Sequence, residues 1–531
     1  MADSAATNIR ERPDGYGLGH RLVANAATNF VGQAVLLALA FSATPYIVGR
    51  FGASRYGVLM LVLGFVNLLS LFQLGFNSGL VKYLSAALGS GNAKETERYL
   101  CTGLALYLGI GIGVAFALSL GAQWSVSHFF QVPGSLRREA VMGLYLAAVA
   151  FALRFVAEVF SAVPIAAQRF DIVNALFVGS EIVRIAGSVA VVYLGFLVRT
   201  VLAVSILSSL LFLAGSLFAT WHLVPGARLR PSISGKHLRD LLHFSKFAAV
   251  SQAASRLGNG MDGVIIGHLM PVAFVAFYVV PATLCFKIWA LVGNVTSVTF
   301  PAASSPAIGN SPARLRELYL RSSKMVFALA GLPALSLCFL GRPVLADWIN
   351  PVFAREGATA LELLSVAVFL NCLMHIPDCI SNGLGRPWVP AGFNVAETIL
   401  KFTLFFVLIP PFGVAGAAAG YLITQVLVAP GFLRTANRMV GVGWRELFRR
   451  AYAPALLPLG GAAIALGLCQ PYTQSIGTLL LTLAFAGAIF LILSLFFILD
   501  SQERAALAAL AGRAGLGIWA TGSHSVSGGE S

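Results

Sequence analysis

QRFDIVNALFVGSEIVRIAGSVAVVYLG, residues 168–195, decides the fold, because the chain contains a second version of this stretch 217 residues later. The second version is GRPWVPAGFNVAETILKFTLFFVLIPPFG, residues 385–413. The two share an arginine at their second position, and Arg184, inside an apolar run, falls on Lys401. A repeat of this length indicates a duplicated structural unit.

Further pairs share this offset, within one residue, over some 200 residues. Besides the stretch itself, the aligned pairs are Gly49/Gly267, Asn77/Asn294, Arg154/Asn371, Glu158/His375 and, at the far end, Gly195/Gly413. The polar members fall inside apolar segments. The pattern therefore predicts two related halves with a polar seam.

The composition places the chain in a membrane. Hydrophobic residues make up 58% of the 531 positions, charged residues 11%, and the mean hydropathy is +0.82, values typical of a polytopic membrane protein. The first twenty residues contain no apolar core, so we expect no cleavable signal peptide. The six cysteines lie in or beside apolar segments without paired spacing, which argues against a disulfide framework or a zinc site.

About fourteen apolar segments are long enough to cross roughly 30 Å of hydrocarbon. They span approximately residues 23–48, 56–80, 100–121, 140–165, 172–195, 200–222, 245–268, 272–300, 325–347, 359–383, 388–410, 413–433, 452–470 and 476–499. No connection between them is long enough for a soluble domain.

The distribution of Lys and Arg predicts the orientation. With the N-terminus in the cytoplasm, most cations fall in the inner loops, which is the usual bias of membrane proteins. The outer loops hold only Arg50, Arg55, Arg137, Arg138, Arg199, Arg342 and Arg355. The net charge of +15 is therefore explained by topology, and we expect no nucleic acid partner.

We expect an all-α polytopic protein with about 14 transmembrane helices. An N-lobe of helices 1–6 (residues 1–222) is followed by a cytoplasmic linker (223–240), a C-lobe of helices 7–12 (241–437), and two extra helices with a cytoplasmic tail (438–531). Because each half has six helices, both enter the membrane from the same side and form parallel repeats. Such lobes commonly hold a substrate site between them.

Ionisable residues inside the apolar segments are the candidates for function. One such charge at the bilayer centre costs roughly 2.5–3.5 kcal/mol, so it needs a partner or water. Three couples lie one helical turn apart and can neutralise themselves: Arg154/Glu158, Glu181/Arg184 and Glu397/Lys401. Lys287 has no acid nearby in the sequence.

Two interpretations of these residues stay open: they are structural pairs that fix helix packing, or they line a wet central cavity. In the second case Arg154, Arg184, Arg256, Lys287 and Lys401 are the substrate-binding cations and Asn77 and Asn294 are polar cavity groups. The candidate coupling carboxylates are Glu158, Asp262, Asp378 and Glu397, while His375 is more simply explained as a hydrogen-bonded core residue. No pattern indicates a catalytic residue, a metal ligand or a cofactor.

The chain also resembles a known family of membrane proteins. The resembling stretches are VGRFGASRYG (48–57), LGFNSGLVKYLS (74–85), FPAAS (300–304), GLGR (383–386) and FGVAGAA (412–418). In this order and spacing they resemble the multidrug/oligosaccharidyl-lipid/polysaccharide exporter superfamily, specifically its O-antigen type flippases of polysaccharide biosynthesis.

The resemblance implies two lobes that open alternately to each side of the membrane. The substrate would be an undecaprenyl-diphosphate-linked oligosaccharide, moved from the cytoplasmic to the periplasmic leaflet of the bacterial inner membrane for O-antigen, capsule or exopolysaccharide synthesis. A polysaccharide polymerase and co-polymerase are the implied partners, and we expect a monomer. The alternatives are a multidrug or organic-cation antiporter of the same superfamily, a lipid II translocase, and, from another class, a membrane enzyme of polysaccharide assembly.

Overall fold

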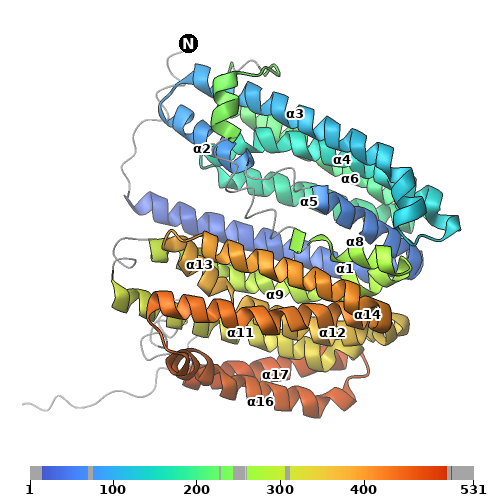
Figure 1. The fold of residues 1–531 in the computed structure, drawn as a ribbon, viewed down its shortest axis with the longest axis vertical. Coiled ribbons are helices and arrows are strands. Elements are labelled where there is room, and N and C mark those ends of the chain that lie inside the picture. The colour runs from blue at the N-terminus through green and yellow to red at the C-terminus, as the bar shows by residue number, and fades with distance from the viewer. Residues whose placement is uncertain are drawn as a thin grey trace, which may run out of the picture. The chain divides into compact units, whose positions relative to one another are not determined.

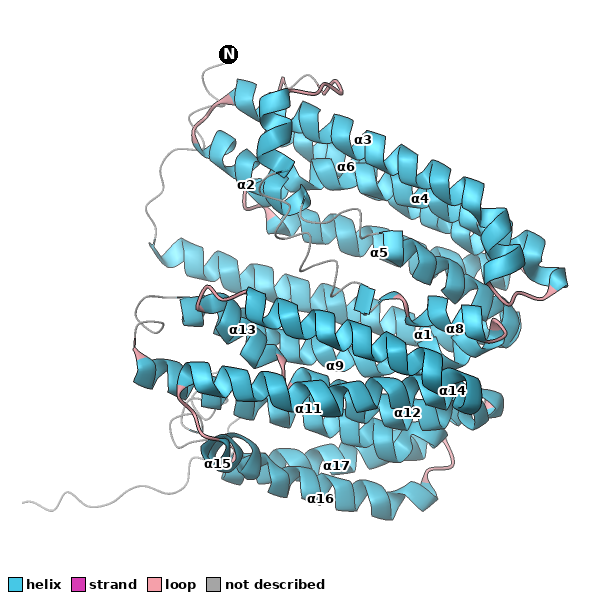
Figure 2. Ribbon diagram, viewed as in Figure 1, coloured by secondary structure: helices cyan, strands magenta, loops and turns pink. Residues whose placement is uncertain are grey.

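The computed structural model describes residues 15–69, 76–226, 229–242, 257, 258, 260–304, 311–498 and 504. Within these residues the chain is helical and contains no strand (Figure 2). The first helices are α1 (Gly15–Leu69), α2 (Phe76–Gly89), α3 (Ala93–Trp124), α4 (Gly134–Ala166), α5 (Phe170–Tyr193), α6 (Val198–Leu223), α8 (Asp262–Leu269) and α9 (Ala273–Ser304). They are followed by α11 (Pro312–Trp348), α12 (Pro351–Cys372), α13 (His375–Gly383), α14 (Trp388–Val440), α15 (Trp444–Leu447), α16 (Ala453–Cys469) and α17 (Ile476–Phe497) (Figure 1).

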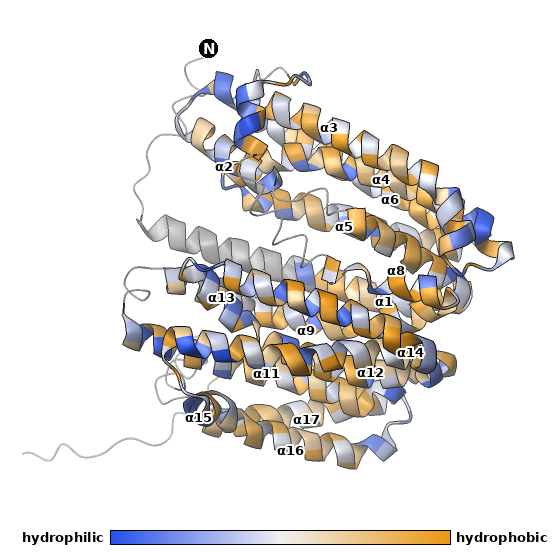
Figure 3. Cartoon of the chain, in the orientation of Figure 1, coloured by the Kyte–Doolittle hydropathy of each residue, from blue (hydrophilic) through white to orange (hydrophobic). Residues whose placement is uncertain are grey.

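Eleven helices of the described part are long and apolar enough to cross a membrane. Apolar residues cover most of their length (Figure 3). The prediction of an all-α, multi-pass membrane protein is confirmed.

The structure has fewer long helices than the sequence has predicted segments, because two long helices each bend at a glycine and continue. α1 carries segment 23–48 and most of segment 56–80, and its backbone leaves helical geometry at Gly52 (φ 70°, ψ 170°). α14 carries segments 388–410 and 413–433 and bends at Gly413 (φ 58°, ψ −136°). Positive φ is accessible to glycine without a Cβ clash, so these two positions allow one helix to follow another without a loop. Most of segment 245–268 lies outside the described residues.

The backbone repeats where the sequence repeats. After α4, the amides of Ala167, Gln168 and Arg169 donate to the carbonyls of Val163, Ile165 and Pro164. After α13, the amides of Leu384, Gly385 and Arg386 donate to Ile380, Asn382 and Ser381, which are the same bonds displaced by 217 residues. Gln168 and Gly385 both have positive φ, at 58° and 71°. The two copies thus end a helix with the same turn.

By its internal contacts the chain divides into two compact units. Unit 1 contains Met1–Pro281, Trp348–Ala360 and Ala391–Tyr421, and unit 2 contains Ala282–Asp347, Leu361–Pro390 and Leu422–Ser531. The lobe boundaries drawn from the repeat remain a prediction.

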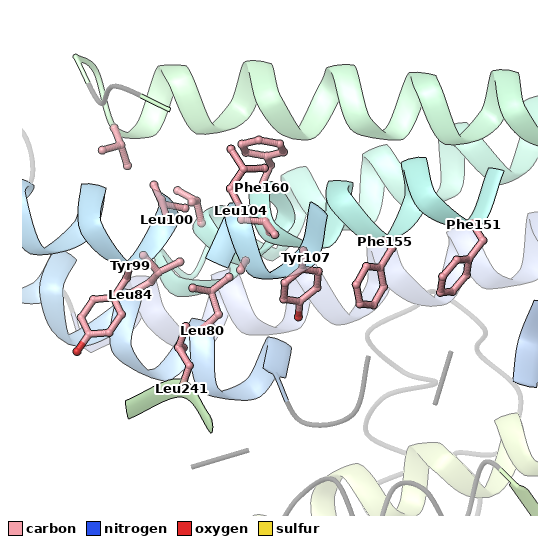
Figure 4. Close-up of a cluster of buried hydrophobic side chains, with 14 residues drawn as sticks. Leu80, Leu84, Tyr99, Leu100, Leu104, Tyr107, Phe151, Phe155, Phe160 and Leu241 are labelled. Atoms are coloured by element: carbon pink, nitrogen blue, oxygen red, sulfur yellow. The ribbon is translucent and has the colours of Figure 1, made fainter. Parts of the chain in front are cut away.

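In unit 1, α4 packs between α3 and α6 (Figure 1). A buried aromatic row follows this contact, with the ring of Tyr107 4.6 Å from that of Phe155, and Phe155 5.4 Å from Phe151 (Figure 4). Leucines of α2 and α3, such as Leu80 and Leu104, complete the cluster. In lipid, such contacts act through close packing, because the surrounding hydrocarbon is as apolar as the side chains.

In unit 2, α16 and α17 pack against each other and share a buried cluster with α11 that includes Ala328, Leu459 and Phe490. Near the start of α11, Arg316 forms an ion pair with Glu446 of α15, and Glu317 accepts from Arg450 at 2.8 Å. The two extra helices are therefore anchored to the rest of unit 2 by packing along their length and by charge at one end.

The bend of α14 depends on a second glycine. A Cβ at Gly416 would overlap the carbonyl oxygen of Leu408, which the bend at Gly413 brings close. We predict that Gly416→Ala lowers the free energy of unfolding by about 1–3 kcal/mol, the usual cost of overpacking. Gly392→Ala on the same helix is the matched control, since a Cβ there meets nothing within 4 Å. Thermal unfolding of the two purified variants in detergent measures the difference, and equal melting temperatures would contradict the prediction.

Candidate functional site

Four charged residues of unit 1 line one open cavity of about 570 Å³. They are Arg154 and Glu158 of α4, and Glu181 and Arg184 of α5. α1 and α6 supply the remaining walls, including three serines of α6, Ser205, Ser208 and Ser209. Two of the self-neutralising couples expected from the sequence therefore face the same space.

The couple on α5 forms a close ion pair. Arg184 donates from Nε and Nη2 to one oxygen of Glu181, at 2.9 and 2.6 Å. The two residues are i,i+3 neighbours on one helix, so local geometry alone brings them together. Both side chains remain partly exposed to the cavity, at 36% and 20%.

The couple on α4 is looser. Arg154 Nε lies 4.0 Å from Glu158 Oε1, at the limit of an ion pair. The Arg154 guanidinium instead lies 3.6 Å from the ring centre of Phe212 and donates weakly to Ser180 Oγ at 3.4 Å. Glu158 accepts a hydrogen bond from Asn77 Nδ2 of α2 at 2.9 Å. Arg154 is consequently the cation of this cavity whose charge is least matched by a carboxylate.

The polar face of α6 was not anticipated from the sequence. Ser205, Ser208 and Ser209 share a helix face because they are separated by three and four residues. Ser208 Oγ donates to the carbonyl of Ser180 at 2.8 Å and so ties α6 to α5. The i,i+3,i+4 spacing of serines within an apolar helix is the signal that identifies such a face.

Lys401 occupies a different place, also in unit 1. Its Nζ lies 2.7 Å from Asp262 Oδ1 and donates to the carbonyl of Gly258, and the residue is only 2% exposed. Asp262 in turn accepts from Tyr278 OH at 2.9 Å. The expected pairing of Lys401 with Glu397 is therefore wrong: α8 supplies the carboxylate, and Glu397 lies half-buried one turn away. A buried charge needs a close partner, and Asp262 is in reach of the ammonium group.

Unit 2 holds Lys287, Asn371, His375 and Asp378. Lys287 is exposed on α9 and has no hydrogen bond or ion pair with any residue the structure describes. Asn371 Nδ2 donates to Gln425 at 3.4 Å, and His375 Nδ1 lies 3.2 Å from the carbonyl of Asn371. Asp378 is half-buried on α13.

Two predicted residues cannot be placed in a site. Arg256 lies outside the described residues, and Asn294 belongs to α9, where its side chain is not described. Among the described residues, no three His, Cys, Asp or Glu side chains are grouped as a metal site would require.

The cavity of unit 1 has the chemistry to hold an anion and to exchange a proton. A guanidinium over an aromatic ring keeps its N–H donors available for phosphate or carboxylate oxygens. Carboxylates next to such a group can take up a proton when the cation turns to a ligand. Nothing in this set of side chains forms a nucleophile with its base.

Comparison with known proteins assigns the family. A sequence model described as a polysaccharide biosynthesis protein matches residues 50–349. The chain is 21% identical over 415 residues to a candidate O-antigen transporter of Shigella flexneri, covering 77% of this chain and 96% of that protein. It is 26% identical over 227 residues to a probable low-salt glycan biosynthesis flippase of Haloferax volcanii, covering 40% of this chain and 46% of that protein.

Solved structures show the same fold. The lipid II flippase MurJ in an inward closed conformation aligns with a TM-score of 0.65 at 12% identity, covering 87% of this chain and 98% of that one. An inward-facing multidrug resistance transporter of the MATE family aligns with a TM-score of 0.62 at 16% identity, covering 76% and 94%. The chain belongs to the family described as polysaccharide biosynthesis proteins, and it has the fold of these solved transporters.

Proposed function

We propose that this protein moves an undecaprenyl-diphosphate-linked oligosaccharide from the cytoplasmic to the periplasmic leaflet of the bacterial inner membrane. The named relatives, an O-antigen transporter and a glycan flippase, support this class of substrate. The bias of Lys and Arg supports cytoplasmic termini. The product would pass to a polysaccharide polymerase and its co-polymerase.

The observation that carries the proposal is the charged cavity of unit 1. Four ionisable side chains that lipid would penalise are kept partly exposed there, rather than sealed in dry contacts. A purely structural network would gain by excluding water and closing its pairs. In the proposed mechanism a diphosphate or an acidic sugar contacts Arg154, and Arg184 joins it when its bond to Glu181 loosens.

Glu158 is the coupling carboxylate that the geometry favours. It lines the cavity, retains 24% side-chain exposure, and lies between Asn77 and Arg154. Proton binding would remove the charge that faces Arg154 and weaken the hydrogen bond from Asn77. Asp378 and Glu397 remain proposed coupling carboxylates, and Asp262 remains one only if the test of its pair with Lys401 below excludes a packing role. Lys287, Arg256 and Asn294 remain proposed cavity groups, and the division into two lobes, residues 1–222 and 241–437, remains a prediction.

Movement of the lipid-linked glycan can be measured with the purified protein in proteoliposomes. A fluorescent undecaprenyl-diphosphate oligosaccharide should become accessible to a membrane-impermeant quencher faster than in empty vesicles, with its glycan chemically unchanged. An altered glycan would instead indicate an enzyme of polysaccharide assembly. Transport of organic cations without glycan lipid would indicate a multidrug antiporter, and preference for lipid II a cell-wall translocase.

Arg154→Gln is expected to reduce surface polysaccharide at least about tenfold at normal protein level, because a charge-assisted hydrogen bond contributes about 1.5–3 kcal/mol. The matched control is Arg169→Gln, at the turn between the same two helices, where the side chain pairs with Asp171 outside the cavity. Quantified surface glycan and immunoblots give the comparison. Normal polymer in Arg154→Gln would exclude this residue from the substrate site.

The buried pair of Asp262 and Lys401 is expected to act in packing. Lys401→Met alone should lower the protein level strongly, since an unpaired buried carboxylate costs about 3–5 kcal/mol. The double variant Asp262→Asn, Lys401→Met should restore both protein level and surface polysaccharide. A double variant that folds with a normal yield but transports nothing would assign Lys401 or Asp262 to transport instead.

A further inference from the structure

A second cavity of unit 1 is lined by four arginines. This open cavity of about 710 Å³ lies where α3 ends, where α4 and α6 begin, and beside the part of α1 that follows Gly52. Its arginines are Arg55, Arg137, Arg138 and Arg199. It shares no charged residue with the cavity around Arg154.

Glu139 is the one acidic residue in the lining, and its carboxylate already has two partners. Glu139 Oε1 accepts a hydrogen bond from the amide of Val198 at 2.9 Å, and Glu139 Oε2 lies 3.6 Å from Arg55 Nε. Arg137 donates to the carbonyl of Val132 at 3.3 Å. Arg138 and Arg199 are exposed and form no hydrogen bond or ion pair with the described part of the chain. The cavity thus keeps two positive charges that no group of the described residues matches.

The helices add to this positive potential. α4 begins at Gly134 and α6 at Val198, so two helix N-termini meet at the lining. Each N-terminus carries a partial positive charge, which favours an anion. Hydroxyl groups of Ser127 and Ser135 supply further donors.

Exposed aromatic residues at this end of the helices indicate the depth of lipid headgroups. α3 ends at Trp124 and α5 ends at Tyr193, and these side chains are 61% and 71% exposed. Exposed Trp and Tyr at the ends of spanning helices mark the membrane interface. In the predicted topology this is the outer interface, where arginine is rare: four of the seven outer arginines of the chain line this one cavity.

We propose that this cavity binds a phosphate group at the outer membrane interface, with Arg138 and Arg199 as its main ligands. Guanidinium groups bind phosphate oxygens through paired N–H donors. Arginines that served only solubility would not be expected to gather in one cavity on the side where cations are few. The phosphate comes either from a membrane lipid headgroup or from a free diphosphate. The proposal does not depend on which molecule the protein transports.

The test measures binding to the full-length protein in detergent by microscale thermophoresis. The probes are short-chain phosphatidylglycerol, short-chain phosphatidylcholine and inorganic pyrophosphate. Phosphatidylglycerol should bind saturably and more tightly than phosphatidylcholine, whose choline group opposes the arginines. The double variant Arg138→Gln, Arg199→Gln should weaken it at least about tenfold, because each lost charge-assisted bond contributes about 1.5 kcal/mol or more.

The matched control removes two other exposed outer arginines. Arg342→Gln, Arg355→Gln changes the net charge equally and should leave binding as in the parent protein. Arg138→Lys, Arg199→Lys should retain part of the affinity. Displacement of the lipid by pyrophosphate would identify a free diphosphate as a ligand, whereas no displacement would assign the site to membrane lipid.

Three results would overturn the proposal. Phosphatidylglycerol and pyrophosphate could both fail to bind the parent protein, or the ligand that binds could bind the Gln pair as tightly as the parent. The control pair could also lose affinity to the same extent, which would show a general effect of charge.

Discussion

Hydrocarbon cannot solvate a charge or an unpaired backbone amide, and this constraint governs the whole molecule. It explains why the described chain is helical, because a helix satisfies its own backbone bonds. It explains the turns as well, since the carbonyls at the ends of α4 and α13 are capped by the same set of amides. It also requires every ionised side chain inside the bundle to find a carboxylate, an aromatic face, a carbonyl or water.

The fold could be predicted closely because its signals are local. Apolar length gives the helices, and the duplicated stretch predicts two related halves. The identical turns after α4 and α13 show that the two copies share backbone hydrogen bonds as well as sequence. The continuous helices α1 and α14 were not predicted, because a glycine that usually ends a helix also allows the chain to bend and continue, as Gly52 and Gly413 do.

Whether a charged pair could be predicted depends on how far apart its two residues lie in the sequence. Glu181 and Arg184 could be paired from spacing, because one helical turn joins them. Lys401 could not be paired with Asp262, nor Asn77 with Glu158, since only tertiary packing brings these helices together. The arginine cavity left a signal that hydropathy alone does not register: four of the seven arginines predicted for the outer loops line it.

The pairing of Lys401 has a consequence for biogenesis. α5 can leave the translocon already neutral, because its glutamate and arginine emerge together. Lys401 emerges 139 residues after its acid, so the helix that carries Asp262 has been synthesised long before its cation exists. Until α14 is made, the carboxylate of Asp262 has no access to this cation. Assembly of unit 1 is therefore completed only after Ala282–Asp347 and Leu361–Pro390 of unit 2 have been made.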